Sequence, residues 1–427
     1  GEQGTEYNFG EILPASISGK VHLSDRYGTC FVSGGVTEPL AGVTIQLLDH
    51  FQNIIGETTT DIGGEYTFDG LQPGLYSVIE FTPTGLIDAG AAAGLVNQTT
   101  RGRVVDPNTI ADIQLNAGDQ GQKYDFCEHL PSSISGYVYH DRDDDGSRDE
   151  GEEAIAGATV TLADRDGARL GTTETDVNGY YEFTGLSAGT YRLVETQPSE
   201  WLDGQEAVGL VDGVASGTAS VNDTFDGVQL LWGSAGTQYN YGELKAGSLQ
   251  GVVHADLDRD CIYDPIESPI ANVKIELLSS TGIVLATTYT DSQGEYLFQG
   301  LAPGEYGVRE TQPQGYFHGS QSAGSHGGDD STPDLISQIP VGSGQHLVHY
   351  DFCEIVPGSI SGIVYVDPNQ NDQHEEAELL LAGVRVQLLD ADGDVLATET
   401  TNSSGYYEFN DLEPGIYSVR EFQPEGY

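Results

Sequence analysis

The sequence predicts an all-β protein built of tandem, Ig-like β-sandwich modules in a linear rod. Three observations predict this fold class. The chain repeats itself, its short apolar runs alternate with polar residues, and turn signals separate those runs at regular intervals. No stretch shows the apolar spacing of an amphipathic helix of useful length. Several short strands joined by regular turns are typical of a sandwich.

The repeat is marked by a short motif near the start of each module. Ser16-Ile17-Ser18-Gly19 recurs at 133–136 and 359–362, with a variant at 248–251, so the motif glycines are 117, 115 and 111 residues apart. Self-similarity at such a period indicates an array of similar units. We expect residues 1–15 to form the closing strand of a preceding module, followed by module 1 (16–131), module 2 (132–246), module 3 (247–357) and an incomplete module 4 (358–427).

Within each module the expected strands follow one order. The first strand is followed by an acidic loop and then by an alternating apolar strand, at 43–47 in module 1. Next comes Thr-Asp-x-x-Gly, which we interpret as a hairpin turn at Asp61, with Gly64 supplying a positive φ. A strand starting at Tyr76 and a closing strand at 124–127 complete the module. Linkers of a few residues, such as 129–132, predict a semi-rigid connection.

Composition excludes several functions. The chain carries 67 Asp and Glu against 16 Lys and Arg, a formal net charge of -51. Phosphate groups need cationic partners, so we expect binding neither to nucleic acid nor to anionic membranes. No apolar run approaches the roughly 20 residues of a membrane span, which predicts no membrane insertion in this segment. The absence of Met, even at position 1, suggests a segment of a longer or processed protein.

The acidic loops carry the spacing of a calcium site. Module 2 fits D-x-[DN]-x-[DN]-G-x5-E, which places oxygen ligands at positions suited to a hard cation with six to eight ligands. Modules 3 and 4 repeat this spacing. The predicted ligands of Ca²⁺ are Asp141, Asp143, Asp145, Ser147, Asp149 and Glu152 in module 2; Asp256, Asp258, Asp260, Ile262, Asp264 and Glu267 in module 3; and Asp367, Asn369, Asn371, Gln373, Glu375 and Glu378 in module 4.

A solvated acidic loop is the alternative to a calcium site. Three matches in register favour calcium over chance. Position 6, usually Gly, is Cys261 in module 3 and Asp372 in module 4, which puts the turn geometry of those loops in doubt. In module 1 the stretch 24–30 has lost most carboxylates, so we expect no equivalent site there. Asp61 and its counterparts would add ligands or serve only as turn formers.

The four cysteines follow a rule within the chain. Modules 1 and 3 have Cys both in the acidic loop and in the closing strand, whereas module 2 has Gly at both places. Paired gain and loss predicts that the two positions touch, with four buried free thiols as the alternative. The predicted disulfides, which require an oxidising compartment, are Cys30–Cys127 and Cys261–Cys353.

Together these motifs resemble a known family. Ser-Ile-Ser-Gly, the acidic loop, Thr-Asp-x-x-Gly-x-Tyr-x-Phe and Leu-x-Pro-Gly-x-Tyr-x-Val-x-Glu-x-x-Pro are similar to the SdrD B-like modules of bacterial surface proteins, relatives of the collagen-adhesin B-type (prealbumin-like) sandwich. The resemblance implies calcium-stabilised stalks that project something from a cell. It also implies an isopeptide cross-link in some relatives, for which only module 1 offers the residues Lys20, Glu80 and Asp125. An ordinary strand lysine is the favoured interpretation.

Alternation places Glu80 and its counterparts Glu195, Glu310 and Glu421 on the core-facing side of their strand, where a carboxyl group needs a partner or a proton.

The sequence therefore favours a non-enzymatic, extracellular role, either secreted or at the cell surface. We expect a structural stalk or fibre of calcium-stabilised, disulfide-linked modules, with an adhesin that binds a host or matrix ligand as the alternative. The segment 317–331, which by composition looks like a flexible loop, is the nearest candidate for a ligand loop. The expected partners are further modules or further copies of the chain in a filament. Either the chain is a window of a longer array, or residues 5–11 complete a neighbouring copy by strand addition.

Overall fold

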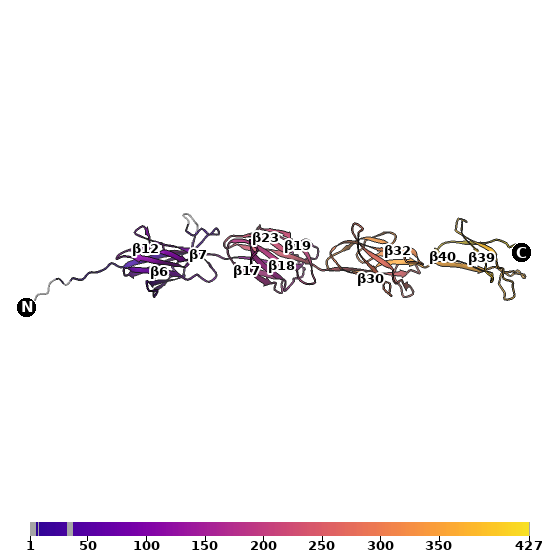
Figure 1. Cartoon of the computed structure of the whole chain (residues 1–427), viewed down its shortest axis with the longest axis horizontal. Coiled ribbons are helices and arrows are strands. Elements are labelled where there is room, and N and C mark those ends of the chain that lie inside the picture. Colours follow the sequence, from indigo (N-terminus) through magenta and orange to yellow (C-terminus); the bar gives the residue numbers. More distant parts are fainter. Residues whose placement is uncertain (1–5, 7, 32–36, 427) are drawn as a thin grey trace, which may run out of the picture. The chain divides into compact units, whose positions relative to one another are not determined.

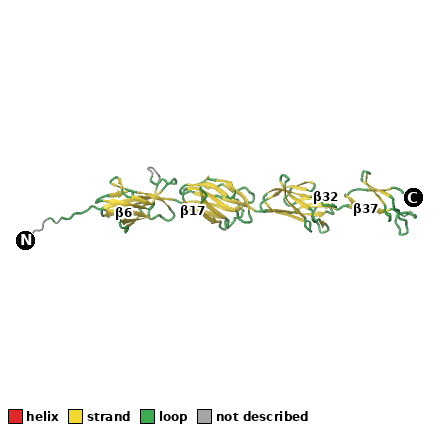
Figure 2. Cartoon of the chain, viewed as in Figure 1, coloured by secondary structure: helices red, strands yellow, loops and turns green. Residues whose placement is uncertain are grey.

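The computed structural model describes residues 6, 8–31 and 37–426 of the chain (Figure 1). These residues fall into two compact units, 1–244 and 245–427, and each unit contains two modules. The secondary structure consists of strands, turns and loops (Figure 2). None of the described residues lies in a helix that is long and apolar enough to cross a membrane. The prediction of an all-β chain of tandem sandwiches is therefore confirmed.

Module 1 is a sandwich of two sheets around one apolar cluster. The larger sheet contains β1 (Ala15–Leu23), β2 (Glu38–Pro39), β5 (Glu65–Leu71), β7 (Ile87–Ala92), β8 (Leu95–Val96), β9 (Thr99–Thr100), β12 (Gln120–Gln122) and β13 (Asp125–His129). The smaller sheet contains β3 (Thr44–Asp49), β4 (Ile54–Thr59), β6 (Gly74–Glu80), β10 (Arg103–Asp106) and β11 (Thr109–Leu115). Described residues before β1, namely 6 and 8–14, form no strand in this chain, and their pairing with another module stays a prediction.

The first strand organises the larger sheet. The start of β1 pairs with β5 and β12, and its end pairs with β2 and, in parallel, with β13. The alternation expected of a half-buried strand is present, since Ile17 and Val21 are fully buried. The last residue of the repeated motif, Gly19, is a glycine for a steric reason. A Cβ there would lie 1.9 Å from the carbonyl oxygen of Tyr124, which also accepts a hydrogen bond from the Tyr66 hydroxyl at 2.5 Å.

The turn at Asp61 is not a hairpin turn, so that interpretation is wrong. It connects β4 in the smaller sheet to β5 in the larger sheet. The Asp61 carboxylate accepts backbone hydrogen bonds from Gly63 and Glu65 at 2.8 and 2.9 Å, which makes it a turn former. Gly64 does have the expected positive φ of 71°, and its backbone N–H donates to the Asp61 carbonyl. Local turn chemistry is the same for a hairpin and a corner, so the motif alone does not distinguish them.

Module 2 repeats this arrangement around its own core. The larger sheet contains β14 (Ser132–His140), β17 (Tyr180–Leu186), β19 (Leu202–Ala207), β20 (Leu210–Val211), β21 (Val214–Ala215), β24 (Ala235–Thr237) and β25 (Asn240–Leu244). The smaller sheet contains β15 (Thr159–Asp164), β16 (Arg169–Glu174), β18 (Gly189–Thr196), β22 (Thr218–Val221) and β23 (Thr224–Leu230). Within this first unit the two modules contact one another: the His129 and Trp232 rings stack at 3.7 Å, and Arg26 pairs with Asp212 at 2.5 Å.

Module 3 is a third sandwich of the same plan. One sheet contains β26 (Gly247–Ala255), β27 (Ser268–Pro269), β30 (Glu295–Leu301), β32 (Phe317–Ala323), β35 (His346–Leu347) and β36 (Tyr350–Ile355). The other contains β28 (Lys274–Ser279), β29 (Val284–Tyr289), β31 (Gly304–Glu310), β33 (Asp329–Thr332) and β34 (Leu335–Val341). The expectation of a flexible loop at 317–331 is wrong. Much of that segment forms β32, which pairs with β36, and the start of β33.

Module 4 has a much smaller core. Its described strands are β37 (Gly358–Ile363), β38 (Arg385–Leu389), β39 (Val395–Thr400), β40 (Tyr406–Leu412) and β41 (Ser418–Glu421). Only Val386, Leu388 and Phe409 form its buried apolar cluster. The prediction that Glu421 faces the core is wrong for this chain, because Glu421 is exposed. No strand among the described residues takes the place that the closing strands β13, β25 and β36 have in modules 1–3.

Candidate calcium-binding loops

In modules 2 and 3 the candidate loop begins directly after the first strand of the module, and the closing strand holds its first residue. In module 2 the backbone N–H of Asp141 donates to the carbonyl of Glu243 at 2.9 Å. In module 3 the N–H of Asp256 donates to the carbonyl of Glu354 at 2.8 Å. Both aspartates are buried, at 0% and 5% exposure. The parallel pairing of first and closing strands thus fixes the position of the first predicted ligand.

The module 2 loop folds back on its own carboxylates. Asp141 accepts backbone hydrogen bonds from Asp145 and Gly146 at 3.2 and 2.8 Å, and Glu152 accepts them from Arg142 and Asp149 at 2.9 and 2.8 Å. These contacts join the start of the loop to its end. Because each carboxylate oxygen has two lone pairs, it can accept an amide proton and still bind a cation.

The carboxylate oxygens of this loop gather within the reach of one ion. One oxygen each of Asp141, Asp143 and Glu152 lie within 4.8 Å of one another, as do those of Asp143, Asp145 and Asp149. Ser147 donates its backbone N–H to Asp145 at 2.7 Å, so it also lies beside the cluster. Oxygen ligands at this density fit Ca²⁺, which takes six to eight of them.

Unbalanced negative charge around the loop has electrostatic effects. Burial raises the pKa of Asp141, while the hydrogen bond from the backbone N–H of Gly146 opposes that rise. Tyr139 is buried and lies two residues before Asp141. Its pKa is raised mainly by burial and, to a smaller extent, by the carboxylates of Asp141 and Glu152. A divalent cation in the loop would relieve this repulsion.

Module 3 has the same contacts with different residues. Asp256 accepts from the backbone N–H groups of Arg259 and Cys261 at 2.6 and 3.1 Å, and Glu267 accepts from Leu257 and Asp264 at 2.8 and 3.1 Å. The predicted ligands Asp258 and Ile262 lie in the same loop, and Asp260 accepts from Ile262 at 2.8 Å. The pKa of Asp258 is raised by desolvation and by Asp260.

The replacement of glycine at position 6 does not abolish the turn. Gly146 has a φ of 76°, and its counterparts Cys261 and Asp372 have φ values of 55° and 58°. A residue other than Gly pays about 1 kcal/mol or more for this conformation. The doubt about loop geometry in modules 3 and 4 is therefore answered by the backbone, which takes the same left-handed conformation in all three loops.

The module 4 loop keeps most of the backbone contacts of the other two loops but offers fewer carboxylates to a cation. Asp367 accepts from Gln370 and Asp372 at 2.7 and 2.9 Å, and Glu378 accepts from Glu375 at 2.9 Å. Gln373 donates its N–H to Asn371 at 2.9 Å. The side-chain amides of Asn369 and Asn371 donate to the Glu375 carboxylate at 3.2 and 3.1 Å, so neutral ligands replace two carboxylates.

Module 1 places a different residue where the other loops have their first aspartate. The backbone N–H of Ser24 donates to the carbonyl of Glu128 at 2.8 Å, as Asp141 does to Glu243. The carboxylate of Asp25 accepts from the Thr29 hydroxyl at 2.6 Å and from the N–H groups of Tyr27 and Thr29. The Thr29 contacts lower the pKa of Asp25. This loop is held by hydrogen bonds around one carboxylate. Residues 32–36 lie outside the described part of the chain.

Both predicted disulfides are confirmed. Cys30 is bonded to Cys127 and Cys261 to Cys353, with Cα atoms 6.0 and 5.5 Å apart. The strand register explains the rule that predicted them. Cys127 pairs with His22, and in module 2 Gly242 pairs with the equivalent residue Tyr139. A Cβ at Gly242 would lie 2.7 Å from the carbonyl oxygen of Gln205, so a residue larger than glycine would clash at this position.

Two of the three residues considered for an isopeptide bond, Lys20 and Asp125, lie on the neighbouring strands β1 and β13, whereas Glu80 lies on β6 in the other sheet of module 1. The backbone N–H of Lys20 donates to the Asp125 carboxylate at 2.9 Å, whereas the Lys20 ammonium group pairs with Glu65 at 2.7 Å. Glu80 is buried, as alternation predicted, and so are Glu195 and Glu310. The geometry is that of an ordinary strand lysine beside an exposed carboxylate.

Sequence reasoning missed the partners of these buried glutamates. Glu128, Glu243 and Glu354 in the closing strands are 0–1% exposed and face Glu80, Glu195 and Glu310. Burial raises the pKa of Glu80 to about 9, and the nearby charge of Glu128 adds to the rise. Burial also raises the pKa of Glu128, to about 7. The alternation of side chains along the strand could have revealed this partner. Glu128 lies two residues after the buried Phe126, and residues two apart in a strand are on the same face.

The fold and the repeated acidic loops define this chain as an array of β-sandwich repeat modules. A model of the SdrD B-like domain matches residues 32–127, 132–243, 247–351 and 358–427. The chain therefore belongs to the SdrD B-like domain family.

Named relatives agree with this assignment. Serine-aspartate repeat-containing protein F of Staphylococcus epidermidis is 32% identical over 400 residues, which cover 91% of this chain and 22% of that protein. Serine-aspartate repeat-containing protein D of Staphylococcus aureus strain MW2 is 30% identical over 395 residues, covering 91% and 28%. The chain thus spans less than a third of the length of these relatives. The major pilin subunit BcpA of Bacillus cereus has a TM-score of 0.37 at 12% identity, covering 80% of this chain and 99% of the pilin.

Proposed function

We propose that this chain is a non-enzymatic segment of an extracellular stalk or fibre, whose modules are stabilised by Ca²⁺ bound in the loops of modules 2, 3 and 4. The observation that carries the proposal is the repeated loop geometry. A first aspartate is followed by carboxylate or amide oxygens and by a final glutamate, which accepts N–H groups from the start and end of the loop in modules 2 and 3 and from the end of the loop in module 4.

Family membership supports a role at the bacterial surface, because 91% of this chain aligns with a serine-aspartate repeat-containing protein of a bacterium, Staphylococcus epidermidis. A stalk needs modules that stay folded outside the cell. Two disulfides and divalent cations would provide that stability in modules whose like charges otherwise repel.

The stabilisation by calcium is expected to be moderate for each loop. Extracellular modules bind Ca²⁺ with Kd values of about 10⁻⁴ to 10⁻³ M. A ligand at a hundredfold excess over its Kd stabilises the folded state by about 2.7 kcal/mol. The full chain should therefore melt at a lower temperature in chelator and recover when calcium is added.

The matched experiment uses variants of the full chain in scanning calorimetry. Asp145→Asn combined with Glu152→Gln should remove the calcium-dependent shift of module 2 and leave those of the other modules. Glu174→Gln combined with Glu182→Gln makes the same change of charge at two exposed positions of module 2 outside the loop. That control should keep the shift. An unchanged melting profile on chelation of the unmodified chain would exclude the calcium assignment.

An adhesin remains the second candidate function, and one structural observation favours it. Module 3 contains a cavity of 690 Å³ on its surface, next to the acidic loop. The sequence candidate for a ligand-binding loop, 317–331, contributes Ser322 to the lining of this cavity.

A further inference from the structure

One position on the larger sheet is equivalent in modules 1, 2 and 3. Strand register places Lys20 opposite Glu65, Tyr137 opposite Tyr180, and Val252 opposite Glu295. In each module the backbone N–H of the first residue donates to a side-chain oxygen of the closing strand, namely that of Asp125, Asn240 or Asp351 at 2.9, 3.0 and 2.7 Å. The three positions therefore share both their backbone environment and a polar neighbour.

Modules 1 and 2 fill this position with a cation of their own. In module 1 the Lys20 ammonium group lies 2.7 Å from the Glu65 carboxylate. In module 2 the guanidinium carbon of Arg148 lies 4.0 Å from the centre of the Tyr137 ring, and the rings of Tyr137 and Tyr180 are 5.3 Å apart. A basic group thus lies at the same place in both modules, although it comes from different strands and loops.

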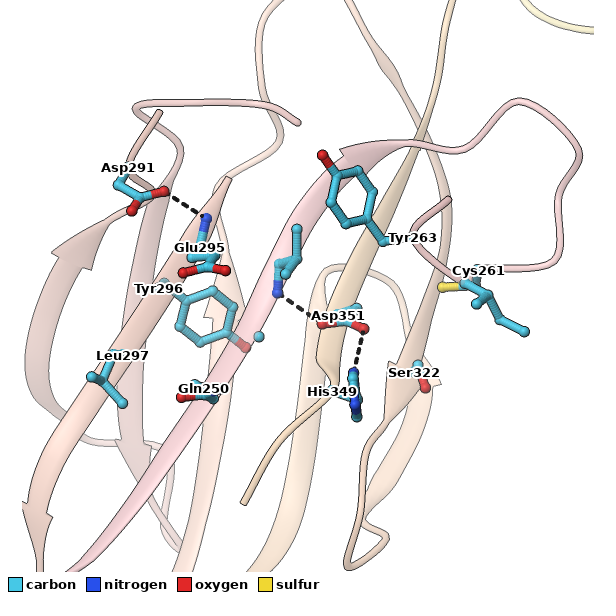
Figure 3. Close-up of a pocket in the computed structure, with 13 residues that line it drawn as sticks. Gln250, Cys261, Tyr263, Asp291, Glu295, Tyr296, Leu297, Ser322, His349 and Asp351 are labelled. Atoms are coloured by element: carbon cyan, nitrogen blue, oxygen red, sulfur yellow. Dashed lines mark hydrogen bonds and ion pairs between the residues drawn. The ribbon is translucent and has the colours of Figure 1, made fainter. Parts of the chain in front are cut away.

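Module 3 leaves the position open. Val252 is smaller than Lys20 or Tyr137, and Tyr263 replaces Arg148 in the loop. The cavity of 690 Å³ lies here (Figure 3). In that view Glu295 and Tyr296 lie on one side of the cavity and Tyr263 and His349 on the other.

The lining of the cavity suits a basic group with an apolar stem. Glu295, Asp291 and Asp351 supply three carboxylates, and none of the residues that line the cavity is Lys or Arg. Asp351 is 5% exposed, accepts the N–H of Val252 at 2.7 Å and lies 3.8 Å from the His349 ring. Leu297 and Tyr263 add apolar surface beside these charges.

We propose that this cavity binds a lysine side chain presented by a peptide segment of a partner protein. The ammonium group would lie by Glu295 as Lys20 lies by Glu65, and the methylene stem would pack against Tyr263 and Leu297. The site differs from the calcium loops in its ligand, because it takes a monovalent cation with an apolar stem. It also goes beyond the stalk function, since a stalk needs no such cavity.

Ligand-observed saturation-transfer NMR on the full chain in saturating calcium tests the proposal. The probe is N-acetyl-lysine methylamide, compared with the norleucine analogue, which lacks the ammonium group, and the glutamate analogue. The lysine probe should give the lowest Kd. Glu295→Gln should weaken its binding by about two- to fivefold, the range of an exposed charge pair, and should leave the norleucine probe unchanged.

Variants that fill the cavity provide the sharper test. Val252→Lys copies module 1 and Val252→Tyr copies module 2, and either should abolish binding of the lysine probe. Circular dichroism and intact disulfides would verify folding, and the Glu295→Gln result stands if one of the two variants does not fold. Glu65→Gln in module 1, where Lys20 is already present, is the matched control and should leave the binding of both probes unchanged. Equal binding of the lysine and norleucine probes, or undiminished binding by a folded cavity-filling variant, would overturn the proposal.

Discussion

Modules 1 and 2 have the same fold but hold the loop after the first strand by different means. In module 1 a disulfide ties the loop to the closing strand, and Asp25 gathers hydrogen bonds around a single carboxylate. In module 2 both cysteines are replaced by glycine, and several carboxylates converge where a divalent cation would fit. The difference teaches that this loop needs an external restraint, which the chain supplies covalently in one module and, we propose, through calcium in the next. Module 3 has both a disulfide and an acidic loop.

Removal of a disulfide should give the largest difference in stability between modules 1 and 2. Replacing Cys30 and Cys127 by Ala should destabilise module 1 by roughly 4–5 kcal/mol, because each bridge closes a loop of nearly 100 residues. Hydrogen exchange with mass spectrometry on the full chain would report protection of β1 and β14 separately. The β14 peptides of module 2 should keep their protection. Equal loss in both modules would contradict the comparison.

Removal of calcium should have the opposite selectivity. In chelator we expect faster amide exchange across residues 141–152, by up to about a hundredfold if 2.7 kcal/mol of stabilisation is lost. The loop at 24–31 should exchange at the same rate with and without calcium, since Ser24 replaces the first carboxylate. Calcium-dependent protection of that loop would show that module 1 also binds the ion.

The buried glutamate pair predicts a pH dependence that both modules share. With folded pKa values of about 9 for Glu80 and about 7 for Glu128, above the ordinary value of 4.5, the folded pair holds more protons than the unfolded chain. The stability that this pair contributes is therefore fully present below about pH 4.5 and is lost as pH rises through the folded pKa values of about 7 and 9. Between pH 7 and 9 the loss should fall from about 2 to about 0.7 kcal/mol per pH unit, because the folded pair holds about 1.5 excess protons at pH 7 and about 0.5 at pH 9.

A variant isolates this effect in module 1. Glu80→Gln keeps the shape of the side chain but cannot ionise, so exchange protection of β1 should lose most of its dependence on pH between 7 and 9. Glu195→Gln should act in the same way on module 2 alone. A stability of module 1 that rises from pH 7 to 9 would show the sign to be wrong.

The smallest expected effect is that of the exposed ion pair in module 1. Lys20 and Glu65 have side chains that are 56% and 57% exposed. Glu65→Gln should therefore change the stability of module 1 by about 0.2–1 kcal/mol, and high salt should abolish the difference. A loss of several kcal/mol in calorimetry would mean that the pair is part of a larger network.

Much of the fold was predictable because it depends on local patterns that repeat. Alternation placed Ile45 and Leu47 in the core, and the paired occurrence of Cys and Gly predicted both disulfides. The loop spacing predicted which carboxylates would converge in module 2, since ligands within 12 residues of one another are brought together by a single turn. The alternating strand recurs in four modules, the loop spacing in three and the cysteine pair in two, which makes chance an inadequate explanation.

Other features depend on contacts between strands far apart in the chain. The turn at Asp61 has the local chemistry of a hairpin, and only the pairing of β5 with β1 makes it a corner between sheets. Composition at 317–331 indicated a loop, but the open edge of β36 recruits that segment as β32.

The sequence by itself determined the strands, the modules, the disulfides and the candidate calcium ligands, because each rests on periodicity or on repeated spacing. Only the tertiary structure decided which buried glutamate faces which, and that module 3 carries an open cavity where modules 1 and 2 carry a cation. The first depends on how the two sheets of a module pack together, because Glu80 lies in the smaller sheet and Glu128 in the larger, and the second depends on the register of β26 with β30 and β36. Register of that kind is set by the packing of the whole sandwich.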